Sequence, residues 1–219
     1  MPNNKSIVDY YRARAAEYEN IYYRKVPERR KEIEDHCDYV RRISENKTVL
    51  DLACGTGYWG KVASKTAREL VGVDISIEMI KQAAQKSFGC RADFVVSSLY
   101  DLPFGPQSFD LIILGFWLSH EPRQNYENLF KAVTHPLKTD GQIWMIDNNP
   151  PAEGPKSESA GADSNGNNLK HRRLENGDEF VIIKNYFETE DLKKIFSGRF
   201  RIIEFVHKKY YWSVLLEQK

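Results

Sequence analysis

The chain has 219 residues, which suits one α/β domain with a full core and leaves little room for two. Its formal net charge of +1 argues against duplex nucleic acid or an acidic membrane surface as the main partner. No apolar run approaches the roughly 18 to 20 residues that span a bilayer, and the N-terminal segment lacks the apolar stretch of a signal peptide. The three cysteines (Cys37, Cys54 and Cys90) have neither metal-ligand spacing nor an even number, so we expect a cytoplasmic protein without a metal site.

Two runs with helical spacing come first. Between residues 6 and 23, Val8, Tyr11, Ala15 and Tyr18 recur three or four positions apart, which predicts a helix with an apolar and aromatic face. Residues 27–43 are densely charged but keep apolar side chains on one side, and they predict a second helix.

From residue 48 onward, strand-like and helix-like runs alternate. The predicted strands cover residues 48–53, 69–73, 93–96, 109–114 and 142–146. The predicted helices cover residues 58–66, 77–86 and 123–133. Such alternation predicts a doubly wound parallel sheet with helices on both faces.

The last third of the chain has a different pattern. Residues 150–168 are polar and rich in Gly, Ser, Asn and Pro, which predicts an exposed, mobile loop. Asn176-Gly177 between the runs 169–174 and 179–186 predicts a β-hairpin. After a helix over 188–196, the β runs 200–206 and 210–216 are so close that they must be antiparallel neighbours. We therefore expect one α/β domain over residues 1–219, with its sheet finished by antiparallel strands.

A glycine-rich turn follows the first predicted strand. Gly55, Gly57 and Gly60 give the spacing G-x-G-x-x-G, and Asp74 ends the next strand, where a carboxylate can accept bonds from two ribose hydroxyls. This pattern alone would suit a dinucleotide equally well. Asp51 favours a methyl donor, because its carboxylate near the loop can hold an ammonium, directly or through water, and a dinucleotide has none. The antiparallel end of the sheet and the bulk of Trp59, which would crowd a pyrophosphate, favour the same ligand.

Residues 49–57, Val73-Asp74, Leu102-Pro103-Phe104 and 108–112 resemble the ordered motifs of class I S-adenosylmethionine-dependent methyltransferases. The resemblance covers about residues 45–147 and implies a seven-stranded Rossmann-like sheet, with S-adenosyl-L-methionine bound across the carboxyl ends of its first strands and S-adenosyl-L-homocysteine as product. The cofactor-binding residues that we expect are Tyr11, Asp51, Ala53, Gly55, Gly57, Trp59, Asp74, Ile75, Ser98, Leu99 and Gly115. Ser98 stands where much of the family has an Asp for the adenine amino group; its hydroxyl can accept that bond, and the Leu99 backbone can serve the ring nitrogen.

The methyl acceptor must be inferred from other segments. His120 lies in the loop after the fourth core strand, where it could contact an acceptor, act as a base or cap the loop. The hairpin supplies Arg172, Arg173 and Lys184; strand alternation places the two arginines on opposite faces, so at most one is expected to point inward.

Residues 10–18, 55–59, 117–120, 172–177 and 183–184 resemble small antibiotic-pathway O-methyltransferases that act on phosphonates. This resemblance implies that residues 1–44 form a helical lid, with Tyr18 and either Tyr22 or Tyr23 facing the acceptor, and that 150–187 are a loop-and-hairpin insertion. It also implies that His120, one of Arg172 and Arg173, and Lys184 surround an anionic group. Residues 150–168 and the region around Arg24-Lys25 depart from the shared pattern, which leaves the acceptor's identity open.

We therefore expect methyl transfer to an anionic oxygen, a phosphonate or carboxylate, of a small molecule. One alternative is an amine or neutral hydroxyl with His120 as base; others are a non-catalytic S-adenosylmethionine-binding protein and a nicotinamide oxidoreductase. Residues 147–151 contain Asn-Pro-Pro, but after the fifth strand rather than the fourth, and we interpret them as the start of a loop. Neither a nucleic-acid nor a membrane partner is expected, and the chain could be a monomer or a homodimer.

Overall fold

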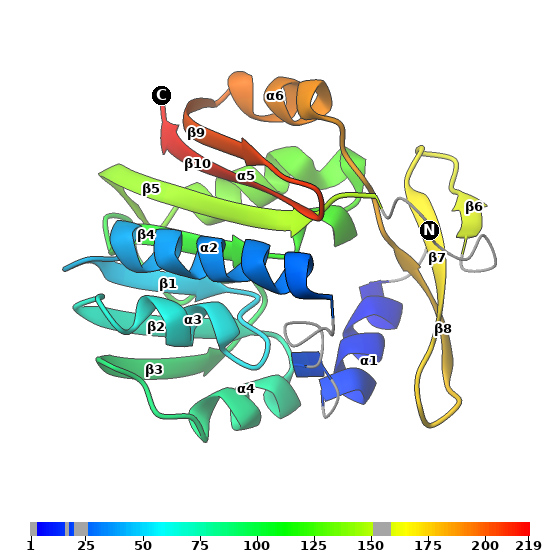
Figure 1. The fold of residues 1–219 in the computed structure, drawn as a ribbon, viewed down its shortest axis with the longest axis horizontal. Helices are drawn as coiled ribbons and strands as arrows, with labels where there is room; N and C mark the ends of the chain where they lie inside the picture. The colour runs from blue at the N-terminus through cyan, green and yellow to red at the C-terminus, as the bar shows by residue number, and fades with distance from the viewer. Residues whose placement is uncertain (1–3, 16–17, 20–25, 151–158) are drawn as a thin grey trace.

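The computed structural model describes residues 4–15, 18–19, 26–150 and 159–219. Its main element is a seven-stranded sheet with the strand order β3-β2-β1-β4-β5-β10-β9. Five strands run parallel and β10 is antiparallel to both β5 and β9 (Figure 1). The strands are β1 (Thr48–Leu52), β2 (Glu69–Asp74), β3 (Arg91–Val96), β4 (Phe109–Gly115), β5 (Leu137–Asn148), β9 (Phe200–His207) and β10 (Tyr211–Gln218). The expected sheet class, with its antiparallel C-terminal strands, is confirmed.

Helices cover both faces of the sheet. The helices of the described chain are α1 (Asn4–Arg14), which lies over the carboxyl edge, and α2 (Pro27–Ile43), α3 (Tyr58–Ala63), α4 (Ile77–Ala84), α5 (Tyr126–Thr134) and α6 (Thr189–Ser197). Short 3-10 turns are η2 (Leu118–His120) and η3 (Arg123–Asn125). The apolar sides of α2 and α3 pack on one face, and those of α5 and α6 on the other. No helix among the described residues is long and apolar enough to cross a membrane.

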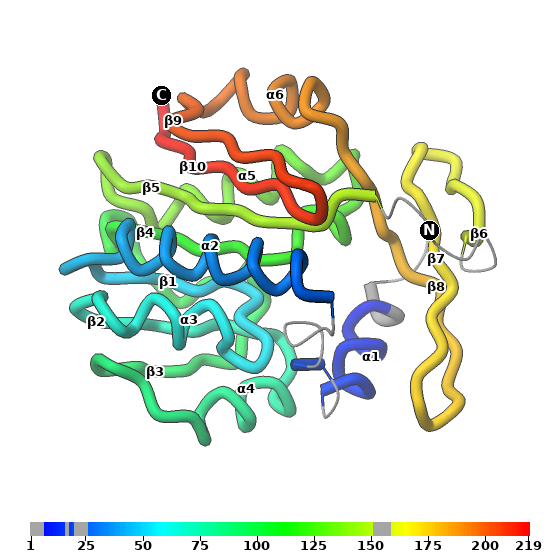
Figure 2. Tube along the Cα trace, viewed as in Figure 1, coloured from blue at the N-terminus to red at the C-terminus, as the bar shows by residue number. Residues whose placement is uncertain are grey.

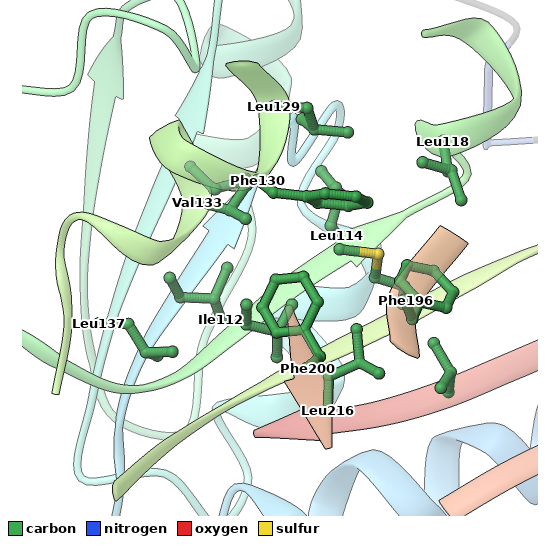
Figure 3. Close-up of a cluster of buried hydrophobic side chains, with 14 of the residues drawn as sticks. Ile112, Leu114, Leu118, Leu129, Phe130, Val133, Leu137, Phe196, Phe200 and Leu216 are labelled. Carbon is green, nitrogen blue, oxygen red and sulfur yellow. The ribbon is translucent and has the colours of Figure 1, made fainter. Parts of the chain in front are cut away.

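Alternation along the central strands builds these two cores. In β1, Val49 packs beneath α2 and α3, whereas Leu50 and Leu52 face α5 and α6. The larger core brings Phe130 of α5 against Phe196 and Phe200, with ring centroids 5.9 and 5.3 Å apart (Figure 3). Because side chains of a strand alternate between faces, each inner strand must be apolar along its whole length. A buried acid in such a strand therefore stands out.

A second, three-stranded sheet lies beyond the carboxyl edge of the main one. It consists of β6 (Ser159–Ala162), β7 (Asn168–Arg173) and β8 (Glu179–Ile183) in that order. Helix α1 lies between this sheet and the main sheet (Figures 1 and 2). Tyr10 of α1 packs against Leu174 and Ile182, so the hairpin holds α1 over the carboxyl edge.

Two predicted segments differ from the structure. The helix expected over residues 6–23 ends at Arg14, because the ring of Tyr18, in a short 3-10 turn, packs over Gly55 instead of continuing the helical face. The loop expected over 150–168 contains strand β6, and Asn167 is fully buried. Its amide bonds to the Arg123 backbone and to Asp163, so a polar segment is ordered through its own hydrogen bonds. Tyr22, Tyr23 and Arg24-Lys25 lie outside the described residues.

Candidate active site

A cleft opens where the carboxyl ends of β1, β2 and β4 face helix α1. Its two connected parts share six lining residues: Ile7, Val8, Ala53, Asp74, Ile75 and Trp117. One part, which we call the β3 end, reaches Ser97–Tyr100 and encloses about 650 Å³, part of it open to solvent. The other, the glycine-loop end, reaches Tyr18, Gly55 and Gly115. The cleft lies at the carboxyl edge of the parallel strands, which is where open α/β sheets bind their ligands.

The glycine turn and Asp74 meet at the floor of the cleft. Gly55 has φ of 54°, and its N–H donates to Asp74 Oδ2 over 2.9 Å, while Ser76 N–H donates to Oδ1 over 2.8 Å. Burial raises the pKa of Asp74, and these backbone donors partly offset the rise. Each carboxylate oxygen has a further lone pair, so Asp74 can still accept from two hydroxyls of a ligand.

Ala53 and Phe116 directly follow β1 and β4 and share an uncommon backbone conformation. Their φ angles are 49° and 58°, in the left-handed region that costs a residue with a side chain roughly 1–3 kcal/mol. Both line the glycine-loop end. Strain at two neighbouring strand ends beside one cleft is typical of a functional site.

Three of the predicted cofactor residues lie behind the cleft instead of lining it. The carboxylate of Asp51 is buried, and its Oδ2 accepts from the Gly60 N–H over 2.8 Å, which ties β1 to the start of α3. Burial raises the pKa of Asp51 to about 7. Gly57 begins α3 with φ of 76°, and Trp59 is a core residue whose ring lies where a side chain on Gly115 would be. All three therefore shape the loop from its inner side.

The N-terminal segment covers the glycine-loop end. A side chain on Gly55 would come within 3.3 Å of the Tyr18 ring, so glycine is needed there for close approach as well as for its φ. Glu19 pairs with Lys86, whose ammonium also donates to the Thr56 carbonyl of the glycine loop. These contacts, and Tyr11 and Tyr18 ring centroids 5.7 Å apart, hold the described part of this segment against the glycine loop; the lid itself stays a prediction.

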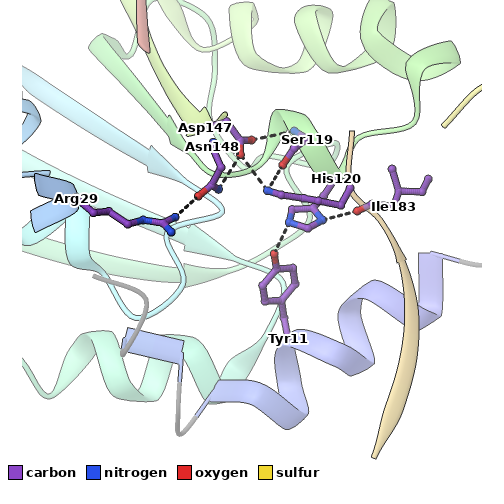
Figure 4. Close-up of polar contacts among 8 residues, drawn as sticks. Tyr11, Arg29, Ser119, His120, Asp147, Asn148 and Ile183 are labelled. Carbon is purple, nitrogen blue, oxygen red and sulfur yellow. Dashed lines mark hydrogen bonds and ion pairs between the residues drawn. The ribbon is translucent and has the colours of Figure 1, made fainter. Parts of the chain in front are cut away.

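His120 lies at the junction of cleft, lid and hairpin (Figure 4). Its Nδ1 is 2.6 Å from the Ile183 carbonyl, which can only accept, so Nδ1 carries the proton and donates. Burial, and next the positive charge of Lys184, hold the pKa of His120 well below its usual value, so the ring is neutral. Its Nε2 therefore accepts from the Tyr11 hydroxyl, 2.8 Å away.

Lys184 does not end in open solvent or in the cleft. Its ammonium is 3.0 Å from Asp147 Oδ1 and 2.6 Å from Ser119 Oγ, with both ends of the ion pair buried (Figure 4). Asp147 also accepts from the Ser119 and Asn148 backbone N–H groups. Burial opposes ionisation of Asp147, but Lys184 and the other partners outweigh it and lower its pKa.

Sequence reasoning missed Asp147, because residues 147–151 were interpreted as the start of a loop. In the structure β5 continues to Asn148, and Asp147 is fully buried at its end. The available signal was the acid itself, which directly follows the apolar run 143–146.

The two arginines of the hairpin differ in position. Arg172 is half-buried; burial is the main cause of the lowered pKa values of His120 and Lys184, and the charge of Arg172 lowers both further. Arg173 is exposed. Lys170, two positions before Arg172 on β7, also lowers the pKa of Lys184. The hairpin therefore brings two cationic side chains near His120 and Lys184, and the sequence had indicated only one of them.

Comparisons with known proteins point to one family. Residues 49–141 match the family described as "Methyltransferase domain". Solved structures of DhpI, in complexes described as DhpI-SAH and DhpI-SAM-HEP, superpose with TM-scores of 0.78 and 0.76 at 22% and 24% identity, covering 98% and 96% of this chain and 96% of each of those chains. The 1,6-didemethyltoxoflavin-N1-methyltransferase of Burkholderia thailandensis superposes with a TM-score of 0.68 at 12% identity, over 100% of this chain and 91% of its own.

Curated relatives carry the same family name. A demethylmenaquinone methyltransferase of Bacillus licheniformis is 28% identical over 113 residues, which are 50% of this chain and 48% of that protein. One from Listeria monocytogenes is 29% identical over 116 residues, again 50% and 48%. The chain thus spans about half the length of the curated relatives it matches.

Proposed function

We propose that the chain is a class I methyltransferase and that it transfers a methyl group from S-adenosylmethionine to an anionic oxygen of a small molecule, a phosphonate or a carboxylate; its methyltransferase-domain match and its fold support this. The observation that carries the proposal is the cleft itself: the glycine turn and Asp74 lie at its floor, and its lining includes His120, which is hydrogen-bonded to Ile183 of the hairpin. The complex of DhpI with SAM and HEP supports a methyl donor and a second ligand together in such a fold.

The chain's own residues would hold the donor by shape and hydrogen bonding. Asp74 would accept from the ribose hydroxyls, and the bare backbone at Gly55 would let the donor approach closely. When bound, S-adenosylmethionine supplies a methyl group already activated by the sulfonium. The protein's task is then mainly to align the acceptor oxygen with that methyl and to exclude water, for which α1 and Tyr18 are placed.

Charge at the acceptor side favours an anion. Lys184 is paired with Asp147, and the hairpin adds the charge of Arg172 near His120 and Lys184 and that of Lys170 near Lys184. An anionic oxygen needs cationic groups to hold it and needs no general base. A neutral His120 would then serve as a hydrogen-bonding wall, positioned by Ile183 and Tyr11.

A second candidate is methylation of a nitrogen or a neutral hydroxyl. The structural likeness to a toxoflavin-pathway N1-methyltransferase supports it, and so does the unprotonated Nε2 of His120. A lowered pKa, however, makes His120 a weak base near neutral pH, because catalytic bases work best with a pKa close to the working pH. Methylation of a nitrogen or a neutral hydroxyl is therefore the second candidate.

An acceptor screen with methyl-labelled S-adenosylmethionine tests the proposal. Small phosphonates and carboxylates are compared with their neutral esters and with matched amines, under identical conditions. We expect label transfer to the acids and little to the neutral counterparts. Transfer to amines or neutral hydroxyls alone would favour the second candidate, and no transfer despite tight S-adenosylhomocysteine binding would favour a non-catalytic binding protein.

A further inference from the structure

Glu121 is a buried acid that the proposed reaction does not use. It is 3% exposed and lines the β3 end of the cleft, beside Tyr100 and Trp117. Among the described residues that line this end, Asp74 and Glu121 are the two carboxylates. Asp74 also reaches the glycine-loop end and Glu121 does not, which places Glu121 toward the side away from Gly55.

The hydrogen bonds of Glu121 come from neutral donors. Trp117 Nε1 donates to Oε2 over 3.1 Å, the Asn125 amide donates to Oε1, and the Tyr100 hydroxyl is a third neutral hydrogen-bonding partner. Two carboxylate oxygens offer about four lone-pair sites, so acceptor capacity remains. Within the described ranges no cationic side chain pairs with Glu121; a buried carboxylate in such a setting is costly unless further donors satisfy it, and a ligand in the cleft can supply one.

The direction of a bound nucleoside follows from the cleft. With the ribose on Asp74 and the rest of the donor against Gly55 at the glycine-loop end, the base extends toward Ser97–Tyr100 at the β3 end. Ile75, Leu99 and Trp117 offer apolar surface for the two ring faces. The polar edge of the base would then approach Glu121.

The other polar side chains at the β3 end are less suited to accept a hydrogen bond from the polar edge of the base. Ser98 Oγ already accepts from the Tyr100 N–H over 3.2 Å, and Asp101 is exposed and outside the lining. Adenine presents an exocyclic amino group as a donor at its 6-position, whereas a 6-oxo purine presents an acceptor that would repel a carboxylate.

We propose that Glu121 accepts a hydrogen bond from the 6-amino group of the donor's adenine and makes the site selective for adenine over 6-oxo purines. The inference rests on the proposed function, since it assumes a nucleoside in this cleft. Glu121 is then a specificity residue, distinct from the groups that hold the acceptor. Its bond to Trp117 fixes the carboxylate toward the base.

Calorimetric titration of two ligands tests this role. S-adenosylhomocysteine and its 6-oxo analogue, S-inosylhomocysteine, are titrated into wild type, Glu121→Gln and Asp101→Asn. We expect wild type to prefer the adenine ligand by about 100-fold or more, since a site built for one hydrogen-bonding group strongly rejects its mismatch. In Glu121→Gln, whose amide can donate to a 6-oxo group, the preference should shrink at least about tenfold. The exposed Asp101→Asn controls for net charge and should keep the wild-type preference.

The outcomes separate the two proposals. Equal affinity of wild type for both ligands, or an unchanged preference in a folded Glu121→Gln, would overturn the role of Glu121 and leave the proposed function standing. Failure of wild type to bind S-adenosylhomocysteine at all would refute the proposed function. If Glu121→Gln does not fold, Glu121→Asp keeps the charge but withdraws the carboxylate from the base by one methylene. The preference for the adenine ligand should fall in that variant as well, and an unchanged preference would overturn the role of Glu121.

Discussion

The ammonium of Lys184 and the carboxylate of Asp147 form a buried ion pair, 3.0 Å apart, that joins strand β8 of the small sheet to the carboxyl end of β5. Lys184 and Asp147 are 7% and 0% exposed. The pair therefore connects the acceptor side of the site to the core of the main sheet.

Removing either partner should destabilise the protein. Asp147→Ala would leave an uncompensated buried ammonium, and we expect a loss of about 3–5 kcal/mol in the free energy of unfolding. The double variant Asp147→Asn with Lys184→Met removes both charges and should recover most of that loss. Urea denaturation monitored by circular dichroism measures the free energy of unfolding of each variant. Equal losses in the single and double variants would contradict a stabilising role of the ion pair.

The two arginines of β7 form a matched pair for testing the anionic acceptor. Arg172 acts electrostatically on His120, whereas Arg173 is exposed. We expect Arg172→Ala to raise KM for an acidic acceptor at least about tenfold, because the variant loses a hydrogen bond to a charged group. The affinity for S-adenosylhomocysteine should stay unchanged. Arg173→Ala should alter KM less than about twofold. Steady-state kinetics with an acceptor identified by the screen would show this difference, and equal effects of the two variants would argue against a hairpin anion site.

The pH dependence of turnover tests whether His120 is a base. Its pKa is lowered, so the ring stays neutral as the pH falls through the usual histidine range, and turnover should show no histidine-like decline between about pH 8 and about pH 5.5. His120→Ala should cost about tenfold through lost positioning. A general base would instead contribute about 100-fold or more, and its loss would abolish activity across this range.

Asp51 should impose a pH dependence on the stability of the unliganded protein. Its pKa is raised from 3.8 to about 7 by burial, so the folded state holds a proton that the unfolded state has lost, and stability falls as pH rises between these values. A shift of about three units corresponds to roughly 4 kcal/mol. Asp51→Asn keeps an oxygen for the Gly60 N–H without the charge. Its stability relative to wild type should therefore improve from about pH 5 to about pH 8 in urea titrations, and a constant difference would contradict the buried charge.

Much of the fold could be predicted because its signals are local. The apolar runs of β1 and β4 and the helical spacing of α2 are visible within a few residues of sequence, and so is the Asn176-Gly177 turn, where Gly177 has φ of 92°. Strand β6 could not be predicted in this way. Its segment lacks an apolar pattern, and its order depends on hydrogen bonds such as those of Asn167 to distant residues.

The residues of the site likewise differ in whether a local signal in the sequence places them. Gly55 and Asp74 could be placed in the cleft because each ends or follows a strand of the parallel sheet. Asp147 and Glu121 could not, since their roles depend on contacts between segments that only the fold brings together. The Tyr11–His120 hydrogen bond, for example, joins residues 109 positions apart. The burial of Lys184 likewise follows from its contacts with Ser119 and Asp147, which are distant from it in the sequence.

Binding of the methyl donor in the carboxyl-edge cleft can be measured by calorimetric titration of S-adenosylhomocysteine into wild type and Asp74→Asn. We predict saturable one-to-one binding to wild type, at least about tenfold weaker binding to the variant through the lost ribose contact, and no response to NADH. Heat released by NADH but not by S-adenosylhomocysteine would contradict the account.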